Sequence, residues 1–71
     1  MPSEITAHIT GTVWKISKKV GDRVTPGETV VIIESMKMEM PVESEVEGAV
    51  LEVRCKEGDA VQEGAVLLVV G

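Results

Sequence analysis

Short apolar runs, separated by turn residues, cover almost the whole chain. Most apolar positions are valine or isoleucine, whose branched side chains favour extended backbone. Runs such as "TVVII" and "AVLLVV" have the length of a strand and are too short to cross a bilayer as a helix. The pattern predicts an all-β fold without a helix, with strands at residues 4–10, 12–18, 29–34, 38–42, 45–47, 49–55 and 66–70.

The pattern repeats, without a gap, at an offset of 37 residues. Each copy contains a strand, a Gly-Asp turn, a short strand, a glycine turn and a second strand, since glycine adopts positive φ without strain. Because each copy has one apolar face, we expect the two copies to pack as a small sandwich or flattened barrel with a pseudo-twofold axis. The repeat aligns identical residues in pairs: Gly11 with Gly48, Val13 with Val50, Lys19 with Lys56, Gly21 with Gly58, Asp22 with Asp59, Val24 with Val61, and Gly27 with Gly64.

A lysine stands at the junction of the two copies. The copies span about residues 1–36 and 38–71 of one small domain, so Lys37 falls in the connection, which is most simply a tight hairpin with an exposed tip. Three of the four methionines alternate with polar residues around it. Such alternation also fits an ordinary half-buried strand, in which this lysine has no special role.

The same symmetry makes a prediction about the chain ends. The second junction between the copies is left open, so Met1 and Gly71 should lie close to each other and far from Lys37. The strand that begins near Ile5 should therefore neighbour the strand that ends near Val70.

Composition narrows the possible partners and compartments. The net charge of −5 argues against nucleic acid and against an anionic membrane surface, because both require a basic face. The single cysteine excludes an internal disulfide, and the N-terminal segment lacks the basic start and apolar stretch of a secretory signal. We expect a cytoplasmic protein that is a monomer in isolation.

A few other polar residues are candidates for chemistry. His8 is the only histidine, so we expect no metal site and an exposed strand residue. Cys55 is expected to be a half-buried structural thiol. Glu43, Glu45 and Glu47 alternate along the chain, which indicates a solvated strand face or a contact with a partner enzyme.

The stretch "ESMKM" resembles the biotinylation motif of biotin carboxyl carrier domains, in which the lysine between two methionines carries biotin. The similarity extends from about residue 9 to residue 70. It implies that Lys37 is the attachment site and that Met36 and Met38 are its characteristic neighbours. Glu34 and Ser35 match the two positions that precede this core in the family.

The resemblance also implies a fold. The family has a flattened eight-stranded barrel of two four-stranded antiparallel sheets, with pseudo-twofold symmetry and the modified lysine at a turn. Lys18 and Cys55 depart from the family at equivalent positions that are usually aliphatic, so we expect less burial there. Because the copies align without a gap, there is no room for the inserted "thumb" loop of many bacterial carriers. The chain resembles the thumbless type, as a small free-standing attachment protein or as a fragment of a larger carboxylase.

By resemblance, the chain is a carrier without catalytic residues. Biotin protein ligase would attach biotin, and carboxybiotin would move between biotin carboxylase and carboxyltransferase sites. A lipoyl carrier, or a protein that accepts both groups, is the alternative, although a lipoyl lysine usually follows Asp and precedes Ala. A β interaction module without modification is a further alternative.

Overall fold

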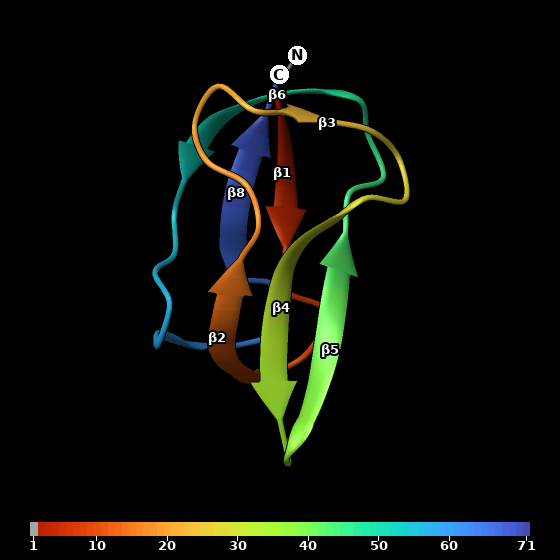
Figure 1. Cartoon of the computed structure of the whole chain (residues 1–71). Helices are drawn as coiled ribbons and strands as arrows, with labels where there is room; N and C mark the ends of the chain where they lie inside the picture. Colours follow the sequence, from red (N-terminus) through yellow and green to blue (C-terminus); the bar gives the residue numbers. More distant parts are fainter. Residues whose placement is uncertain (1) are drawn as a thin grey trace.

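Eight strands and no helix form residues 2–71, the part of the chain that this computed structural model describes (Figure 1). The two sheets have the strand orders β1-β8-β6-β3 and β5-β4-β2-β7, and all strand pairs are antiparallel. No helix in this part of the chain is long and apolar enough to cross a membrane. The strands are β1 (Ser3–Thr6), β2 (Gly11–Ile16), β3 (Arg23–Val24), β4 (Thr29–Ser35), β5 (Met38–Glu43), β6 (Gly48–Val53), β7 (Ala60–Val61) and β8 (Val66–Val70).

The sequence repeat is also a repeat of the structure. Replacing β1, β8, β6 and β3 by the equivalent strands of the other copy converts one sheet order into the other. Hydrogen bonds between the copies follow the same offset. The Gly21 N–H donates to the Val50 carbonyl at 2.9 Å, and the Gly58 N–H donates to the Val13 carbonyl at 2.7 Å. The expected flattened barrel of two four-stranded sheets with pseudo-twofold symmetry is confirmed.

Most of the core consists of branched apolar residues that occur in repeat-related pairs. Burying one such side chain contributes about 1.5–3 kcal/mol relative to leaving it exposed. Each sheet contains two strands of each copy, so neither copy can bury its apolar residues without the other. The paired core residues are Ile5 and Val42, Val13 and Val50, Val30 and Leu67, Val31 and Leu68, and Ile33 and Val70.

The Gly-Asp turns have the same geometry in both copies. Gly21 and Gly58 have φ of 95° and 94°, a conformation that side-chain-bearing residues rarely adopt. The carboxylate of the following aspartate accepts the backbone N–H three residues before it, from Lys19 at 3.1 Å and from Lys56 at 2.9 Å. This local hydrogen bond explains why the sequence pairs glycine with aspartate at both turns.

Several strand boundaries differ from the prediction. Residues 45–47 are predicted as a strand, but Glu45 and Val46 form a bend and Glu47 lies in no strand. Ser44 is buried, and its hydroxyl donates to the Val46 carbonyl at 2.7 Å and accepts the Val46 N–H at 3.1 Å. A side chain that satisfies nearby backbone groups in this way replaces the strand ladder.

Other strands are shorter than predicted. The first strand ends at Thr6, so His8 lies in a bend after β1. Strands β2 and β6 end at Ile16 and Val53, two residues before the predicted ends. The short strands expected between the turns are present as β3 and β7, with two residues each.

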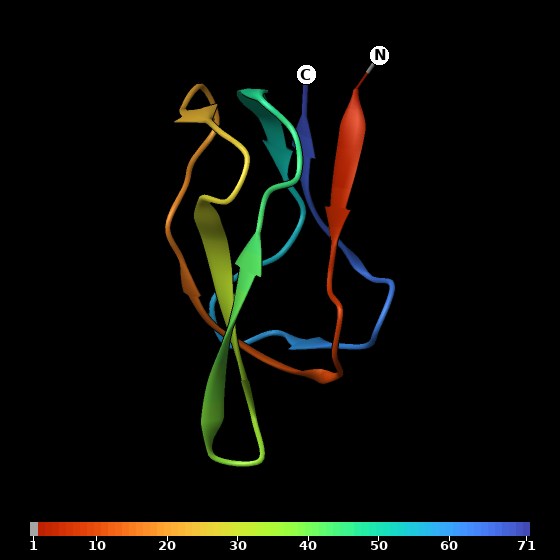
Figure 2. The same cartoon turned by 90° about the vertical axis from the view of Figure 1, so that its right-hand side faces the viewer.

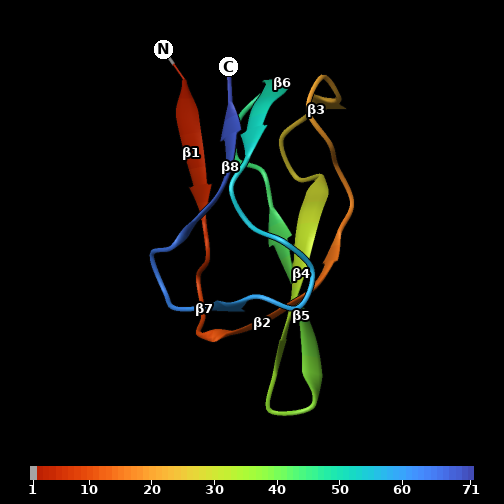
Figure 3. The same ribbon diagram turned by 90° about the vertical axis from the view of Figure 1, so that its left-hand side faces the viewer.

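The first and the last strand lie where the symmetry predicts. Strands β1 and β8 pair, with Ser3 opposite Val70, so the prediction that they are neighbours is confirmed. Met1 lies outside the described residues. The N-terminal strand and the C-terminal strand begin and end at one end of the molecule, and the β4–β5 hairpin projects from the other end (Figures 1 and 3).

Candidate functional site

The β4–β5 hairpin ends in a two-residue turn. Ser35 pairs with Met38, which leaves only Met36 and Lys37 as the loop. The turn projects beyond the rest of the barrel, away from the chain ends (Figure 2). Antiparallel pairing continues along the hairpin from Ser35 to Thr29, so the turn stands on an ordered two-stranded support.

Both loop residues have a left-handed backbone. The φ of Met36 is 53° and that of Lys37 is 66°. Positive φ at both central residues is characteristic of a type I′ turn, which matches the right-handed twist of a hairpin and normally selects Asn or Gly. Side-chain-bearing residues in this conformation cost about 1–2 kcal/mol each. The β4–β5 pairing therefore imposes a conformation that these two residues do not prefer.

The side chains at the turn face solvent. Met36 is 92% exposed and Met38 is 62% exposed, and Lys37 is exposed as well. Within residues 2–71 the Lys37 amine forms no ion pair. A partner enzyme can therefore reach the amine without moving any other part of the described chain.

The half-buried-strand interpretation of the methionines is wrong for Met36. This residue lies in the turn, not in a strand, and exposes almost all of its side chain. Only Met40, opposite Ile33 on the hairpin, is partly buried. Two exposed thioethers therefore flank the lysine, and a flexible unbranched side chain can adapt to a partner surface.

The hairpin brings the motif residues together at one end of the molecule. Glu34 and Ser35 are the last residues of β4, and Met38 is the first of β5. Glu34 lies directly opposite Glu39, so two carboxylates are side by side below the turn. No sequence pattern singles out Glu39. A two-residue loop centred on Met36 and Lys37 would have been enough to place it opposite Glu34.

The remaining candidates lie away from this turn. His8 is exposed in its bend, and no group of metal-ligating side chains occurs among residues 2–71. Glu43, Glu45 and Glu47 are exposed as expected, but only Glu43 lies in a strand. The Glu47 carboxylate is 3.5 Å from the Arg23 guanidinium.

The expectation of a half-buried thiol at Cys55 is wrong, because this residue is buried, whereas Lys18 is partly buried. Cys55 is only 7% exposed, and burial raises the pKa of its thiol, with a further contribution from the negative charge of Asp59. The Lys18 side chain is 18% exposed. Its amine pairs with Glu28 and donates to the Arg23 carbonyl at 3.2 Å. A lysine fits a position that is aliphatic in the family because its methylene stem is covered while its charge finds a partner.

The ion pair of Lys18 and Glu28 was not predicted. The Lys18 hydrogen bond lowers the pKa of the Glu28 carboxyl, and the Thr25 backbone N–H, 3.0 Å from a Glu28 oxygen, lowers it further. The two residues are ten positions apart, in different connections. Sequence spacing alone therefore gave no signal that they meet.

Comparison with known proteins agrees with this geometry. A family model described as "Biotin-requiring enzyme" matches residues 1–70. The biotin/lipoyl attachment protein of Bacillus subtilis is 47% identical over 64 residues, which cover 90% of this chain and 88% of that protein. The biotin carboxyl carrier protein of acetyl-CoA carboxylase from Pyropia yezoensis is 45% identical over 54 residues, which cover 76% of this chain and 34% of that protein.

A solved structure shows the same fold. The urea carboxylase of Kluyveromyces lactis superimposes with a TM-score of 0.93 and 37% sequence identity, over 100% of this chain and 6% of that enzyme. The family match and the all-β barrel of two equivalent sheets define the class of protein, a cofactor-attachment domain. The chain belongs to the family of biotin-requiring enzymes, as a biotin/lipoyl attachment domain.

Proposed function

We propose that Lys37 carries covalently bound biotin and that the chain is a biotin carrier. The observation that supports this most strongly is the Met36-Lys37-Met38 sequence at an exposed two-residue turn. The methionine on each side of the lysine favours biotin over lipoate. The similarity to a biotin carboxyl carrier protein supports the same choice.

In the proposed attachment reaction, the Lys37 Nζ is the nucleophile. A biotin protein ligase converts biotin and ATP to biotinyl-adenylate and pyrophosphate. The Lys37 ammonium loses a proton in the ligase site, because only the neutral amine has a lone pair. Nζ then forms an amide bond with the biotin carbonyl carbon, the bond from that carbon to the phosphate oxygen breaks, AMP leaves, and a second proton leaves the nitrogen.

The chain's own contribution is to hold the biotin-bearing Lys37 side chain in an exposed position. When bound, biotin supplies a ring nitrogen that accepts carboxylate from bicarbonate, with ATP hydrolysis, and later transfers it to an acceptor. Tethering raises the effective concentration of this group at both enzyme sites. The left-handed turn holds the tether clear of the barrel, and no residue of the chain takes part in the carboxylation or in the transfer to the acceptor. We therefore propose a non-catalytic carrier.

The proposed partners follow from this role. They are a biotin protein ligase and the biotin carboxylase and carboxyltransferase components of a biotin-dependent carboxylase. We also propose that the carrier is cytoplasmic and monomeric. The acidic net charge and the projecting turn suit transient binding of the turn at several enzyme sites.

The intact mass of the protein tests the proposal. After incubation with biotin, ATP and a biotin protein ligase, the wild-type chain should gain one biotinyl group and Lys37→Arg should gain none. Lys15→Arg and Lys56→Arg remove other exposed lysines and serve as matched controls that keep full labelling. Labelling of Lys37→Arg in comparable yield would overturn the assignment.

Lipoate is the second candidate group. The similarity to a protein named biotin/lipoyl attachment protein favours testing it. Incubation with lipoate, ATP and a lipoate ligase, followed by intact mass, separates the two groups. A lipoyl group gained faster than biotin would replace the proposed function. No gain with either ligase would favour an unmodified β module.

A further inference from the structure

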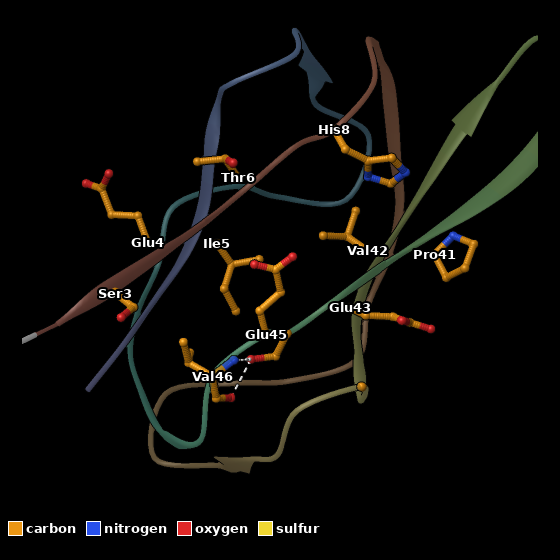
Figure 4. Close-up of a pocket in the computed structure, with 12 residues that line it drawn as sticks. Ser3, Glu4, Ile5, Thr6, His8, Pro41, Val42, Glu43, Glu45 and Val46 are labelled. Carbon is orange, nitrogen blue, oxygen red and sulfur yellow. Dashed lines mark hydrogen bonds between the residues drawn. The ribbon is translucent and has the colours of Figure 1, made fainter.

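The open side of the barrel lies between β1 and β5. Each of these strands is the edge of its sheet, since β1 pairs only with β8 and β5 pairs only with β4. Residues of both strands, and of the bend after β5, line a groove of about 550 Å³ (Figure 4). Two unpaired sheet edges therefore face one groove.

The groove has an apolar floor and an acidic rim. Ile5 and Val42 are buried, and Val46 packs against the core, so these three side chains form the floor. In Figure 4 they form a diagonal row, with Glu4 and Glu43 on opposite sides of it. Glu4, Glu43 and Glu45 are exposed, and no lysine or arginine lines the groove. The charge and the floor together suit an occupant that is both cationic and partly apolar.

The two edges differ in their capacity to accept another strand. Strand β5 contains Pro41, which has no N–H and is typical of protected sheet edges. Strand β1, from Ser3 to Thr6, contains no proline, so the backbone N–H groups that do not pair with β8 remain available on its other side. An extended segment can therefore add to β1 by main-chain hydrogen bonds, the usual mode of β-strand addition.

We propose that this groove binds an extended basic segment of a partner protein. The segment pairs with β1, places apolar side chains over the floor, and places lysine or arginine side chains against Glu4, Glu43 and Glu45. Electrostatic complementarity favours such a partner over a second copy of this chain, because two acidic rims on molecules of net charge −5 repel each other. The groove is separate from the Lys37 turn, so the proposal does not depend on biotin.

The probe is an acetylated and amidated octapeptide in which lysine and valine alternate. It is titrated into ¹⁵N-labelled protein at low salt. We expect saturable shifts at the amides of Ser3–Thr6 and of residues 42–46, together with slower amide exchange in β1. The same peptide with N-methyl groups at alternate residues should lose this binding, since it cannot form the ladder.

Matched charge variants test the rim. Glu43→Gln/Glu45→Gln should weaken binding about threefold to tenfold, as expected for two partly solvated ion pairs. Glu52→Gln/Glu57→Gln makes the same change in net charge at residues that do not line the groove, and it should bind like the wild type. Lys37→Arg should also bind like the wild type, so failure of biotinylation and failure of this site are distinguishable.

Several results would overturn the proposal. These are no binding of the octapeptide, shifts confined to another face, or equal weakening by the two double variants, which would indicate general charge attraction. Equal binding of the N-methylated peptide would exclude strand pairing. Sedimentation that shows a dimer of the protein alone, with protection of β1, would assign the groove to a second copy.

Discussion

At the scale of single residues, the turn is the unusual part of the molecule. Met36 and Lys37 both have positive φ, whereas hairpins normally use Asn or Gly there. Strained backbone at an exposed position persists only where the surrounding structure imposes it, and it often marks a functional site. A glycine at either position would relieve this strain. The presence of methionine and lysine there instead therefore agrees with the proposed modification of Lys37.

Met36→Gly should stabilise the protein. Glycine adopts positive φ freely, and the methionine side chain buries almost nothing, so we expect a gain of about 1 kcal/mol and a melting temperature about 4–8 °C higher. Thermal unfolding followed by circular dichroism measures the change. Met38→Gly, at a strand position, should instead destabilise by about 0.5–1 kcal/mol. Equal destabilisation by both variants would show that the turn is unstrained.

Glu28 should contribute to acid sensitivity. Its pKa is lowered in the folded protein, first by Lys18 and then by Thr25, so its stabilising contribution is present above its ordinary pKa of 4.5 and is lost as the pH falls through the folded pKa. Glu28→Gln should therefore lower the melting temperature at pH 7 more than at pH 3. In a Lys18→Gln background this pH dependence should shrink. A penalty that is the same at both pH values would contradict the role of the pair.

At the scale of elements, the β4–β5 hairpin sets the geometry of the site. Its register fixes a two-residue loop and places Glu34 directly opposite Glu39. Like charges directly opposite on an antiparallel pair are destabilising. The hairpin is therefore acidic next to the turn that carries Lys37. Its stability comes from the strand pairing and the core contacts farther from the turn.

Glu39→Lys should strengthen the hairpin. It replaces a like-charge pair by an opposite-charge pair, worth about 0.2–1 kcal/mol in cross-strand positions. Glu34→Lys should have a similar effect, but the double change to two lysines should restore the repulsion and cancel the gain. Urea unfolding at low and at high salt measures these differences, which should become smaller at high salt. Additive gains in the double variant would exclude the cross-strand interaction.

At the scale of the whole molecule, the pseudo-twofold arrangement separates two ends. One end holds the pairing of β1 with β8, and the other end holds the Lys37 turn (Figure 2). Each copy buries its apolar residues against the other, so one copy alone would expose them. The barrel thus acts as a rigid spacer between the chain ends and the site.

Fusion of a folded domain should not obstruct the site. A globular domain attached after Gly71 should leave the rate of biotinylation by the ligase unchanged, because that end of the barrel is opposite the turn. The same domain inserted between Met40 and Pro41 should abolish biotinylation, since it interrupts the pairing of β5 with β4. Loss of biotinylation in the C-terminal fusion would show that the ligase contacts both ends of the barrel.

Much of the fold follows from local sequence. The exact offset of the repeat predicts equivalent sheets, because identical turn residues in identical positions produce identical chain reversals. The same offset places Lys37 between the copies, where a reversal is required. Even the neighbouring positions of β1 and β8 follow from symmetry, without any knowledge of long-range contacts.

Other features depended on contacts between distant segments. The burial of Cys55 and the pairing of Lys18 with Glu28 depend on which segments the fold brings beside them. The groove between β1 and β5 exists because both strands lie at sheet edges, a property of strand order that no residue spacing reveals. Sequence patterns report which face of a segment is apolar, but only the packed sheets determine which neighbour covers it and which edge remains open.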